Sequence, residues 1–114
     1  MRKLVKVFKA LSDVNRLRIL KMLEIRPLCV CEITAVLKLA PSTVSKHLSL
    51  LRDANLIHDD KEGKWVNYYL NKNRLDLYST ELLILIKKWL INDELIQNDS
   101  LMVSKVDRNQ LCRG

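Results

Sequence analysis

The stretch "PSTVSKHLSLLRDANLIHDDKEGKWVNYYL", residues 41–70, decides the fold because its hydrophobic period changes midway. In its first part the apolar residues recur at the spacing of one helix face, at Val44, Leu48 and Leu51. This spacing predicts an amphipathic helix, and Pro41 suits its first position because proline is pre-set for a helix start. Asn55 is a residue that tolerates the left-handed conformation with which many helices end.

Beyond Asn55 the pattern becomes extended. Residues 56–58 and 65–70 are rich in β-branched, aromatic and other apolar residues, and a charged turn containing Gly63 separates them. Two such runs joined by a glycine-containing turn predict a β-hairpin.

Working outward, three helices are expected before this stretch. The first is expected over residues 3–11, where leucine and phenylalanine stand at i, i+4 and i+7. The second is expected over about residues 13–25, with Ser12 or Asp13 as its cap and Pro27 as its stop. A third, short helix is expected over "CVCEITAVLK", residues 29–38, with both cysteines in its first turn. Helix, helix, short helix, turn, exposed helix and hairpin, in this order, make a winged helix-turn-helix.

After the hairpin, residues 75–96 contain "LLILIKKWLI", which is apolar on more than one side of a helix. A chain of 114 residues has too little core to cover two helix faces, so we expect a homodimer held by this long helix, with help from residues 3–11. Residues 97–114 have weak periodicity and are expected to be a mobile tail carrying Cys112. The sequence thus predicts one domain, residues 1–96, with a mainly α fold and a small β-hairpin.

Composition narrows the function. The net charge is +7, and residues 1–26 hold eight Lys and Arg against two acids. A basic surface of this kind makes double-stranded DNA the expected partner. The alternative is a basic surface that serves only to keep the protein soluble. No run is long and apolar enough to cross a bilayer, and no signal-peptide core follows the N-terminus, so we expect no membrane partner and a cytoplasmic location. Three unevenly spaced cysteines favour reduced thiols over a disulfide framework.

The exposed face of the predicted 41–54 helix is small, hydroxyl-rich and basic, which suits the major groove of DNA. The expected base readers are Ser42, Thr43, Ser45 and Lys46, with Ser49 and Arg52 on the same side. His47 has two interpretations, a phosphate contact or packing beneath the helix. Lys61 and Lys64 flank the hairpin tip and are expected to meet DNA phosphates or a minor groove, the alternative being an ordinary solvated turn.

In combination, the stretches "FKALSDVNRLRILKML", "LCVCEI", "STVSKHLSLLRDANLI" and "KEGKWVNYYL" resemble the ArsR/SmtB family of metal-responsive repressors over roughly residues 8–70. The resemblance implies a dimer that represses transcription from an operator and leaves the DNA when an effector binds, without enzymatic activity. One departure concerns the helix start: the family commonly has a capping hydroxyl and then glutamine there, whereas this chain has Ala40 and Pro41.

Cys29 and Cys31 admit several interpretations. Each could be a small buried apolar residue. A disulfide between them is strained at this spacing, and catalysis lacks a suitably placed histidine and acid. The resemblance makes Cys-Val-Cys the sensing motif for soft thiophilic ions, which thiolates bind preferentially.

The third ligand departs from the family pattern. Arsenic sensors of this kind often have a further cysteine just after the pair, where this chain has Thr34, and the remaining thiol is Cys112. Three thiolates suit trivalent arsenic or antimony, As(III) or Sb(III), better than a tetrahedral ion. Cadmium or lead, Cd(II) or Pb(II), and a redox or persulfide response remain as alternatives. The family's other site, on the dimer helix, needs histidines, and residues 75–96 contain none.

The spacing of the pair also predicts how binding acts. Residues i and i+2 of a regular helix point about 200° apart, so both thiols could reach one ion only if the first helical turn frays or unwinds. We therefore expect ion binding to move the start of the third helix and, through it, the helix that follows.

Overall fold

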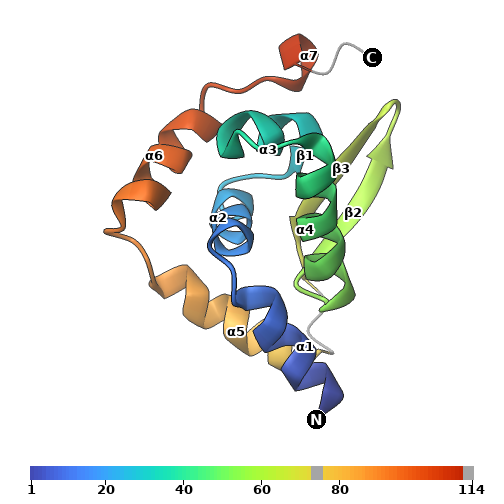
Figure 1. Ribbon diagram of the computed structural model, residues 1–114, viewed down its shortest axis with the longest axis vertical. Helices are drawn as coiled ribbons and strands as arrows, with labels where there is room; N and C mark the ends of the chain where they lie inside the picture. The colour runs from blue at the N-terminus through green and yellow to red at the C-terminus, as the bar shows by residue number, and fades with distance from the viewer. Residues whose placement is uncertain (73–75, 112–114) are drawn as a thin grey trace.

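The computed structural model describes residues 1–72 and 76–111, which are mostly helical with one small sheet (Figure 1). The elements in chain order are α1 Arg2–Leu11, α2 Val14–Leu23, β1 Leu28–Cys29, α3 Val30–Leu37, α4 Pro41–Asp53, β2 Ile57–Glu62, β3 Trp65–Leu70, α5 Leu77–Lys88, α6 Glu94–Val103 and α7 Arg108–Leu111. The mainly α fold with a winged helix-turn-helix arrangement is confirmed.

Short sequence signals fix the ends of the N-terminal helices. Asp13 caps α2, since its carboxylate accepts a hydrogen bond of 3.1 Å from the backbone N–H of Arg16. Lys38 has a left-handed conformation, φ 58°, which ends α3 before the turn into α4. Asn55 has φ 60° directly after α4, as its sequence position predicts. These boundaries set the turn between α3 and α4.

The sheet has the strand order β1-β3-β2, and both pairings are antiparallel. The hairpin agrees with the prediction, except that β2 extends through the charged residues to Glu62, opposite Trp65. Gly63 sits at its tip with φ +59°, a conformation that side chains disfavour. The third strand was not predicted: Cys29 pairs with Asn67, so the cysteine segment enters as a strand before α3 begins.

One core holds these elements together. It joins leucine, isoleucine and valine side chains of α2, α3, α4 and the sheet to Val7 of α1, Ile86 of α5 and Val103 of α6. Ile19, Leu51 and Ile57 are fully buried in it. Val103 is also fully buried, so the chain beyond residue 96 contributes to the core.

The predicted single helix over residues 75–96 is wrong. α5 ends at Lys88, Leu90 takes a left-handed φ of 63°, and α6 begins at Glu94. The break has a local cause: Asp93 accepts a hydrogen bond of 3.1 Å from the backbone N–H of Ile96 and thereby caps a new helix. The predicted boundary between residues 96 and 97 therefore falls inside α6.

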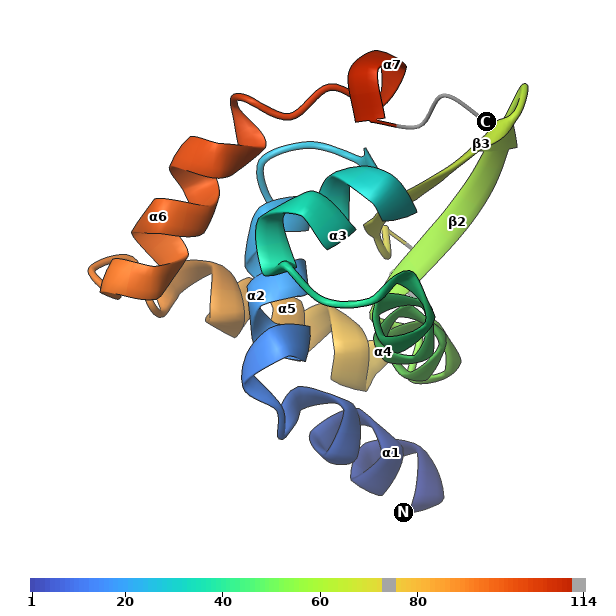
Figure 2. The ribbon, with the colours of Figure 1, turned by 45° about the horizontal axis from the view of Figure 1, so that its top comes forward.

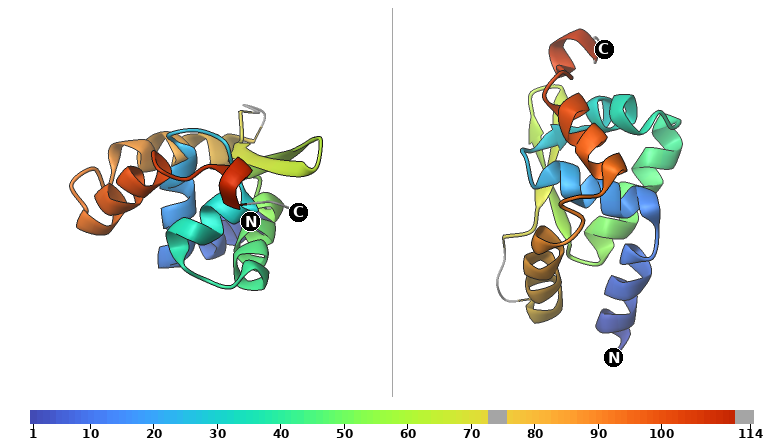
Figure 3. Two further views of the ribbon diagram at one scale, coloured as in Figure 1. Left: turned by 90° about the horizontal axis from the view of Figure 1, so that it is seen from above. Right: turned by 90° about the vertical axis from the view of Figure 1, so that its left-hand side faces the viewer.

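Three views agree on the arrangement. α6 lies across α2 on the side away from the hairpin, and α1 lies beside α5 (Figures 1 and 3). The β2–β3 hairpin projects away from the helices as a wing, next to α4 (Figure 2). None of the helices in residues 1–72 and 76–111 has the length and hydropathy needed to cross a membrane.

Candidate DNA interface and thiol site

The outer face of α4 presents most of the predicted DNA contacts. Ser42, Thr43, Ser45 and Lys46 are exposed, while Ser49 is half-buried. Val44, Leu48 and Leu51 hold the opposite face in the core. Ala40 precedes the helix without a side-chain cap and Pro41 occupies its first turn, as the sequence indicates. A firmly seated helix thus offers hydroxyls and one ammonium to a groove.

Two predicted contacts from α4 have protein partners. The His47 ring nitrogen Nδ1 lies 3.2 Å from Nη1 of Arg16 and 4.0 Å from the Asp13 carboxylate, and its side chain is 14% exposed. These contacts favour the packing interpretation of His47. Arg52 donates a hydrogen bond of 3.1 Å to Asp59 of β2, so part of its charge is compensated within the protein.

The wing carries its lysines at the tip, and both Lys61 and Lys64 are exposed. The Lys64 ammonium lies 5.0 Å from the ring centroid of Trp65, within the range of a cation–π contact. Arg108 of α7 places its guanidinium carbon 4.2 Å from the same ring. Arg108 also donates hydrogen bonds to Glu62, at 3.0 Å, and to Asn67, at 2.8 Å, so α7 is attached to the wing.

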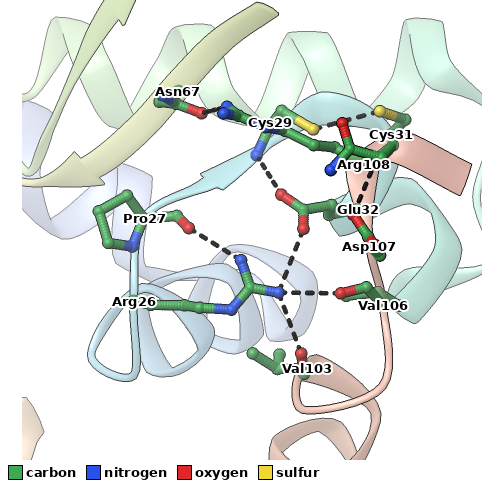
Figure 4. Close-up of polar contacts among 11 residues, drawn as sticks. Arg26, Pro27, Cys29, Cys31, Glu32, Asn67, Val103, Val106, Asp107 and Arg108 are labelled. Atoms are coloured by element: carbon green, nitrogen blue, oxygen red, sulfur yellow. Dashed lines mark hydrogen bonds and ion pairs between the residues drawn. The ribbon is translucent and has the colours of Figure 1, made fainter. Parts of the chain in front are cut away.

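The two cysteine sulfurs of the C-x-C motif face each other, with Sγ of Cys29 and Sγ of Cys31 3.2 Å apart (Figure 4). They converge because Cys29 is the N-cap of α3, with extended backbone angles φ −92° and ψ 168°, whereas Cys31 lies in the first turn. The prediction that both cysteines lie in the first helical turn is wrong for Cys29, which stands outside the helix. The pair therefore converges without unwinding of α3, in agreement with the expectation that a fully helical segment would keep the thiols apart.

A network of polar contacts fixes the segment around the pair. The Glu32 carboxylate accepts a hydrogen bond of 3.0 Å from the backbone N–H of Cys29, in a capping box. Its other oxygen is 3.1 Å from Arg26, which also donates to the backbone carbonyls of Val103 and Val106 (Figure 4). The start of α3 is therefore tied to the chain that follows α6.

Burial raises the pKa of the Cys29 thiol above its ordinary value. The nearby Glu32 carboxylate acts in the same direction, while backbone N–H groups of Glu32 and Cys31 act against it. The thiol consequently keeps its proton at neutral pH until a ligand displaces it.

The two sulfurs lie near enough for one ion to contact both. At bonds of about 2.3 Å, as for thiolate on zinc, two sulfurs on a tetrahedral ion lie about 3.8 Å apart. Within residues 1–72 and 76–111, no three His, Cys, Asp or Glu side chains are grouped to hold a metal ion. Cys112, the predicted third ligand, lies outside the described residues.

A cavity of about 540 Å³ adjoins the pair. Its lining includes Cys29, Cys31, Thr34 and Ala35 from the start of α3 onward, Pro41 at the start of α4, Lys64, Trp65 and Val66 from the wing, and Leu111 of α7. One cavity thus touches the thiols, the recognition helix and the wing.

Sequence reasoning missed several of these residues. Glu32 stands three residues after Cys29, the spacing of a capping box, and that signal was available in the sequence. Arg108 and Trp65 gave no signal, because they meet across 43 residues of chain through the fold alone.

Comparison with known proteins shows to which family this chain is related. The model of a family described as bacterial regulatory protein, arsR family, matches residues 13–59. The arsenical resistance operon repressor of Bacillus subtilis (strain 168) is 38% identical over 90 residues, covering 77% of this chain and 86% of that protein. The chain belongs to the ArsR family.

Other ArsR relatives differ in how far the match extends. The arsenical resistance operon repressor of Escherichia coli (strain K12) is 43% identical over 68 residues, which cover 59% of this chain and 58% of that protein. A cadmium resistance transcriptional regulatory protein CadC homolog of Staphylococcus aureus is 42% identical over 67 residues, covering 58% of this chain and 55% of that protein.

The ArsR fold is shared with a solved structure. The homodimeric winged helix-turn-helix DNA-binding domain Mb0332 from Mycobacterium bovis superposes with a TM-score of 0.67 over 82% of this chain and 82% of that chain, at 22% identity. At this identity the likeness concerns the fold.

Proposed function

We propose that this ArsR-family protein is a homodimeric repressor that binds operator DNA and releases it when trivalent arsenic or antimony binds Cys29, Cys31 and Cys112. The observation that carries the proposal is the sulfur pair, 3.2 Å apart at the start of α3, the helix that precedes the proposed recognition helix α4.

DNA binding uses α4 and the wing. An α-helix fits the major groove, where hydroxyls and ammonium groups can contact base edges and phosphates. The exposed residues of this face are Ser42, Thr43, Ser45 and Lys46, with Lys61 and Lys64 at the wing tip. Pro41 has no side-chain hydrogen bond to offer a base, so one contact that the family commonly makes at this position is missing here.

The dimer forms through α1, α5 and the turn after α5. Large apolar side chains are exposed there: Val5, Phe8, Leu77, Ile84, Leu85, Trp89 and Ile91. Phe8 is 53% and Ile91 63% exposed, and apolar residues gathered in this way mark an interface. α1 and α5 lie side by side, so both helices can contribute to one dimer interface (Figure 1).

Coupling between the thiols and DNA follows from shared neighbours. The cavity beside the pair is lined by Pro41 of α4 and Lys64 of the wing. An ion that binds the sulfurs changes the packing at the start of α3. Because α4 and the wing border the same cavity, they then shift relative to each other. By linkage, an ion that binds the free dimer more tightly than the DNA-bound dimer weakens DNA binding by the same factor.

Titration with arsenite, antimonite and cadmium, while operator release is followed by fluorescence anisotropy, tests the proposal. Cys29→Ser and Cys31→Ser should bind the operator as the wild type does and fail to release it with arsenite. Cys112→Ser should respond more weakly, and arsenic absorption spectroscopy should find three sulfur neighbours in wild type and two in this variant. Normal release in the Cys29→Ser, Cys31→Ser double variant would show that the sensor lies elsewhere.

Two alternative responses would use the same thiols, one to cadmium or lead and one to oxidation. Cadmium or lead would need the sulfurs to separate toward the tetrahedral spacing of about 3.8 Å. A redox response would pair Cys112 with Cys29 or Cys31, and peroxide in the absence of metal should then release DNA. Release by cadmium or peroxide but not by arsenite would select one of these.

A further inference from the structure

Arg16, near the start of α2, contacts two other helices through one guanidinium group. Its Nε donates a hydrogen bond of 2.7 Å to the backbone carbonyl of Ala10, and its Nη2 donates one of 3.2 Å to the carbonyl of Lys9. Both carbonyls lie in the last turn of α1, where backbone acceptors lack helical partners and a positive charge is favourable. Nη1 of Arg16 lies 3.2 Å from Nδ1 of His47, in the middle of α4. Arg16 therefore joins the end of α1 to α4.

The chemistry of the two side chains gives the direction of the contact between α2 and α4. A guanidinium only donates hydrogen bonds, so Nδ1 of His47 is the acceptor. Neither side chain is fully exposed, so water competes less for this hydrogen bond than at the surface. The backbone N–H of Arg16 is itself held by the carboxylate of Asp13, the cap of α2. The start of the Arg16 side chain and its far end are thus both fixed.

Apolar packing does not fill the junction between α1 and α4, although the two helices are in contact (Figure 2). A cavity of about 570 Å³ lies there, and its lining includes Val5 and Lys9 of α1, Leu50 and Asp53 of α4, and Arg16. Because side chains leave this space open, the angle between α1 and α4 depends strongly on the polar contacts made by Arg16.

We propose that Arg16 is a positioning residue for DNA binding, which sets the recognition helix α4 relative to α1 through His47. The proposal rests on the proposed function, in which α1 belongs to the dimer interface and α4 enters the major groove. A dimer reads two half-sites whose spacing matches the separation of its two recognition helices. A change in the angle between α1 and α4 alters that separation, so Arg16 acts on operator affinity without contacting DNA.

A charge-conserving substitution of Arg16 tests the proposal. Arg16→Lys keeps the positive charge but loses the planar fork that reaches acceptors on two helices. We expect it to lower affinity for an operator duplex, selected from random DNA by the wild-type protein, by about tenfold, the effect of losing one hydrogen bond from a charged donor. Arg2→Lys is the matched control, since it makes the same change at an exposed position of α1, and it should bind as the wild type does.

Substitutions of His47 test whether it is the partner through which Arg16 acts. His47→Asn keeps an acceptor, because the asparagine oxygen is as many bonds from the backbone as Nδ1, whereas His47→Leu has none. We expect His47→Asn to bind the operator within about threefold of wild type and His47→Leu to bind it about tenfold more weakly. A role of His47 in helix stability alone predicts the reverse order, because leucine favours helices more than asparagine does.

A double variant shows whether the two residues act through one contact. In the His47→Leu background, Arg16→Lys should lower operator affinity by less than about twofold, because the hydrogen bond is already lost. A full further loss of about tenfold would mean that Arg16 acts independently of His47 and would overturn the proposal.

Fluorescence anisotropy measures operator affinity, and sedimentation measures the oligomeric state of each variant. Equal affinities of Arg16→Lys and Arg2→Lys, or equal weakening by His47→Asn and His47→Leu, would overturn the positioning role. So would an Arg16→Gln variant whose slope of log affinity against log salt concentration is shallower by about one, since this marks a lost phosphate contact. If Arg16→Lys does not fold, the two His47 variants still decide. A monomeric wild-type protein, or one that selects no operator from random DNA, would instead refute the proposed function.

Discussion

Replacement of Asp99 by alanine tests whether α6 is part of the folded domain. Asp99 of α6 binds Arg18 of α2 through two hydrogen bonds, Nε to Oδ2 at 2.8 Å and Nη2 to Oδ1 at 2.9 Å. The side chains are 14% and 6% exposed, for Arg18 and Asp99 respectively, and the pair raises the pKa of Arg18. Removing one partner of a buried ion pair costs roughly 3–5 kcal/mol, because the other charge is left desolvated.

The partial exposure of Arg18 lets water reach the abandoned guanidinium, so the lower end of the range, about 3 kcal/mol, applies. For a chain of this size each kcal/mol lowers Tm by about 4 °C, which gives a decrease of about 12 °C for Asp99→Ala. Circular dichroism melts at one fixed protein concentration measure the effect. Asp59→Ala is the control, since the Arg52–Asp59 pair is 47% and 31% exposed and is worth less than about 1 kcal/mol. If Asp99→Ala melts no lower than Asp59→Ala, α6 does not pack on α2 as described.

Three further outcomes follow from the site and the surface. Lys64→Ala should lower affinity for all DNA sequences alike and reduce the slope of log affinity against log salt concentration by about one, whereas Lys46→Ala should also relax sequence preference. Binding competition at several salt concentrations separates the two effects. Unchanged binding in both variants would show that α4 and the wing do not contact DNA. At pH 8 iodoacetamide should alkylate Cys29 more slowly than an exposed thiol, because a raised pKa leaves less thiolate at a given pH. The alkylation rate should increase only at pH values above the ordinary thiol pKa. Peptide mass spectrometry of the reduced protein measures the rate, and the pH profile of an ordinary thiol would contradict the burial effect. Ile84→Lys places a charge on the exposed α5 face, where Ile84 is 54% exposed, and should yield monomers in sedimentation with helix content unchanged; a wild-type mass would exclude this face from the interface.

Local sequence signals were sufficient for the N-terminal fold. The periodicity of Val44, Leu48 and Leu51, the cap at Asp13 and the turn at Gly63 each act over a few residues, and each is found where the sequence places it. The end of α5 was missed because the apolar run continues through Leu90 and Ile91, while the break depends on one left-handed residue and the cap at Asp93. Periodicity alone does not report such a backbone reversal.

The candidate site was likewise predicted only in part from the sequence. The C-x-C motif identified the thiols, but their convergence depends on β1, a strand of two residues that pairs with Asn67 and Tyr68 of the wing. Long-range contacts of this kind leave no periodic trace in the sequence. The attachment of α7 to the wing through Arg108 is of the same type.

The cysteine pair is held between two groups of contacts that lead to different parts of the molecule. Cys29 is fixed through Glu32 to Arg26, which donates hydrogen bonds to the carbonyls of Val103, at the end of α6, and Val106, just after it. On its other side Cys29 pairs with β3, the strand that carries the wing. Because the backbone of Cys29 is hydrogen-bonded in both directions, a ligand on its sulfur that rotates or shifts this residue must strain the carboxylate contact or the strand pairing. The strand pairing is the contact whose movement would reach Lys64, the proposed DNA contact at the wing tip, so weakening the Glu32 contact should redirect the strain away from the wing. In a Glu32→Gln variant the thiols still bind arsenite, and the release of operator DNA per ion bound is expected to decrease.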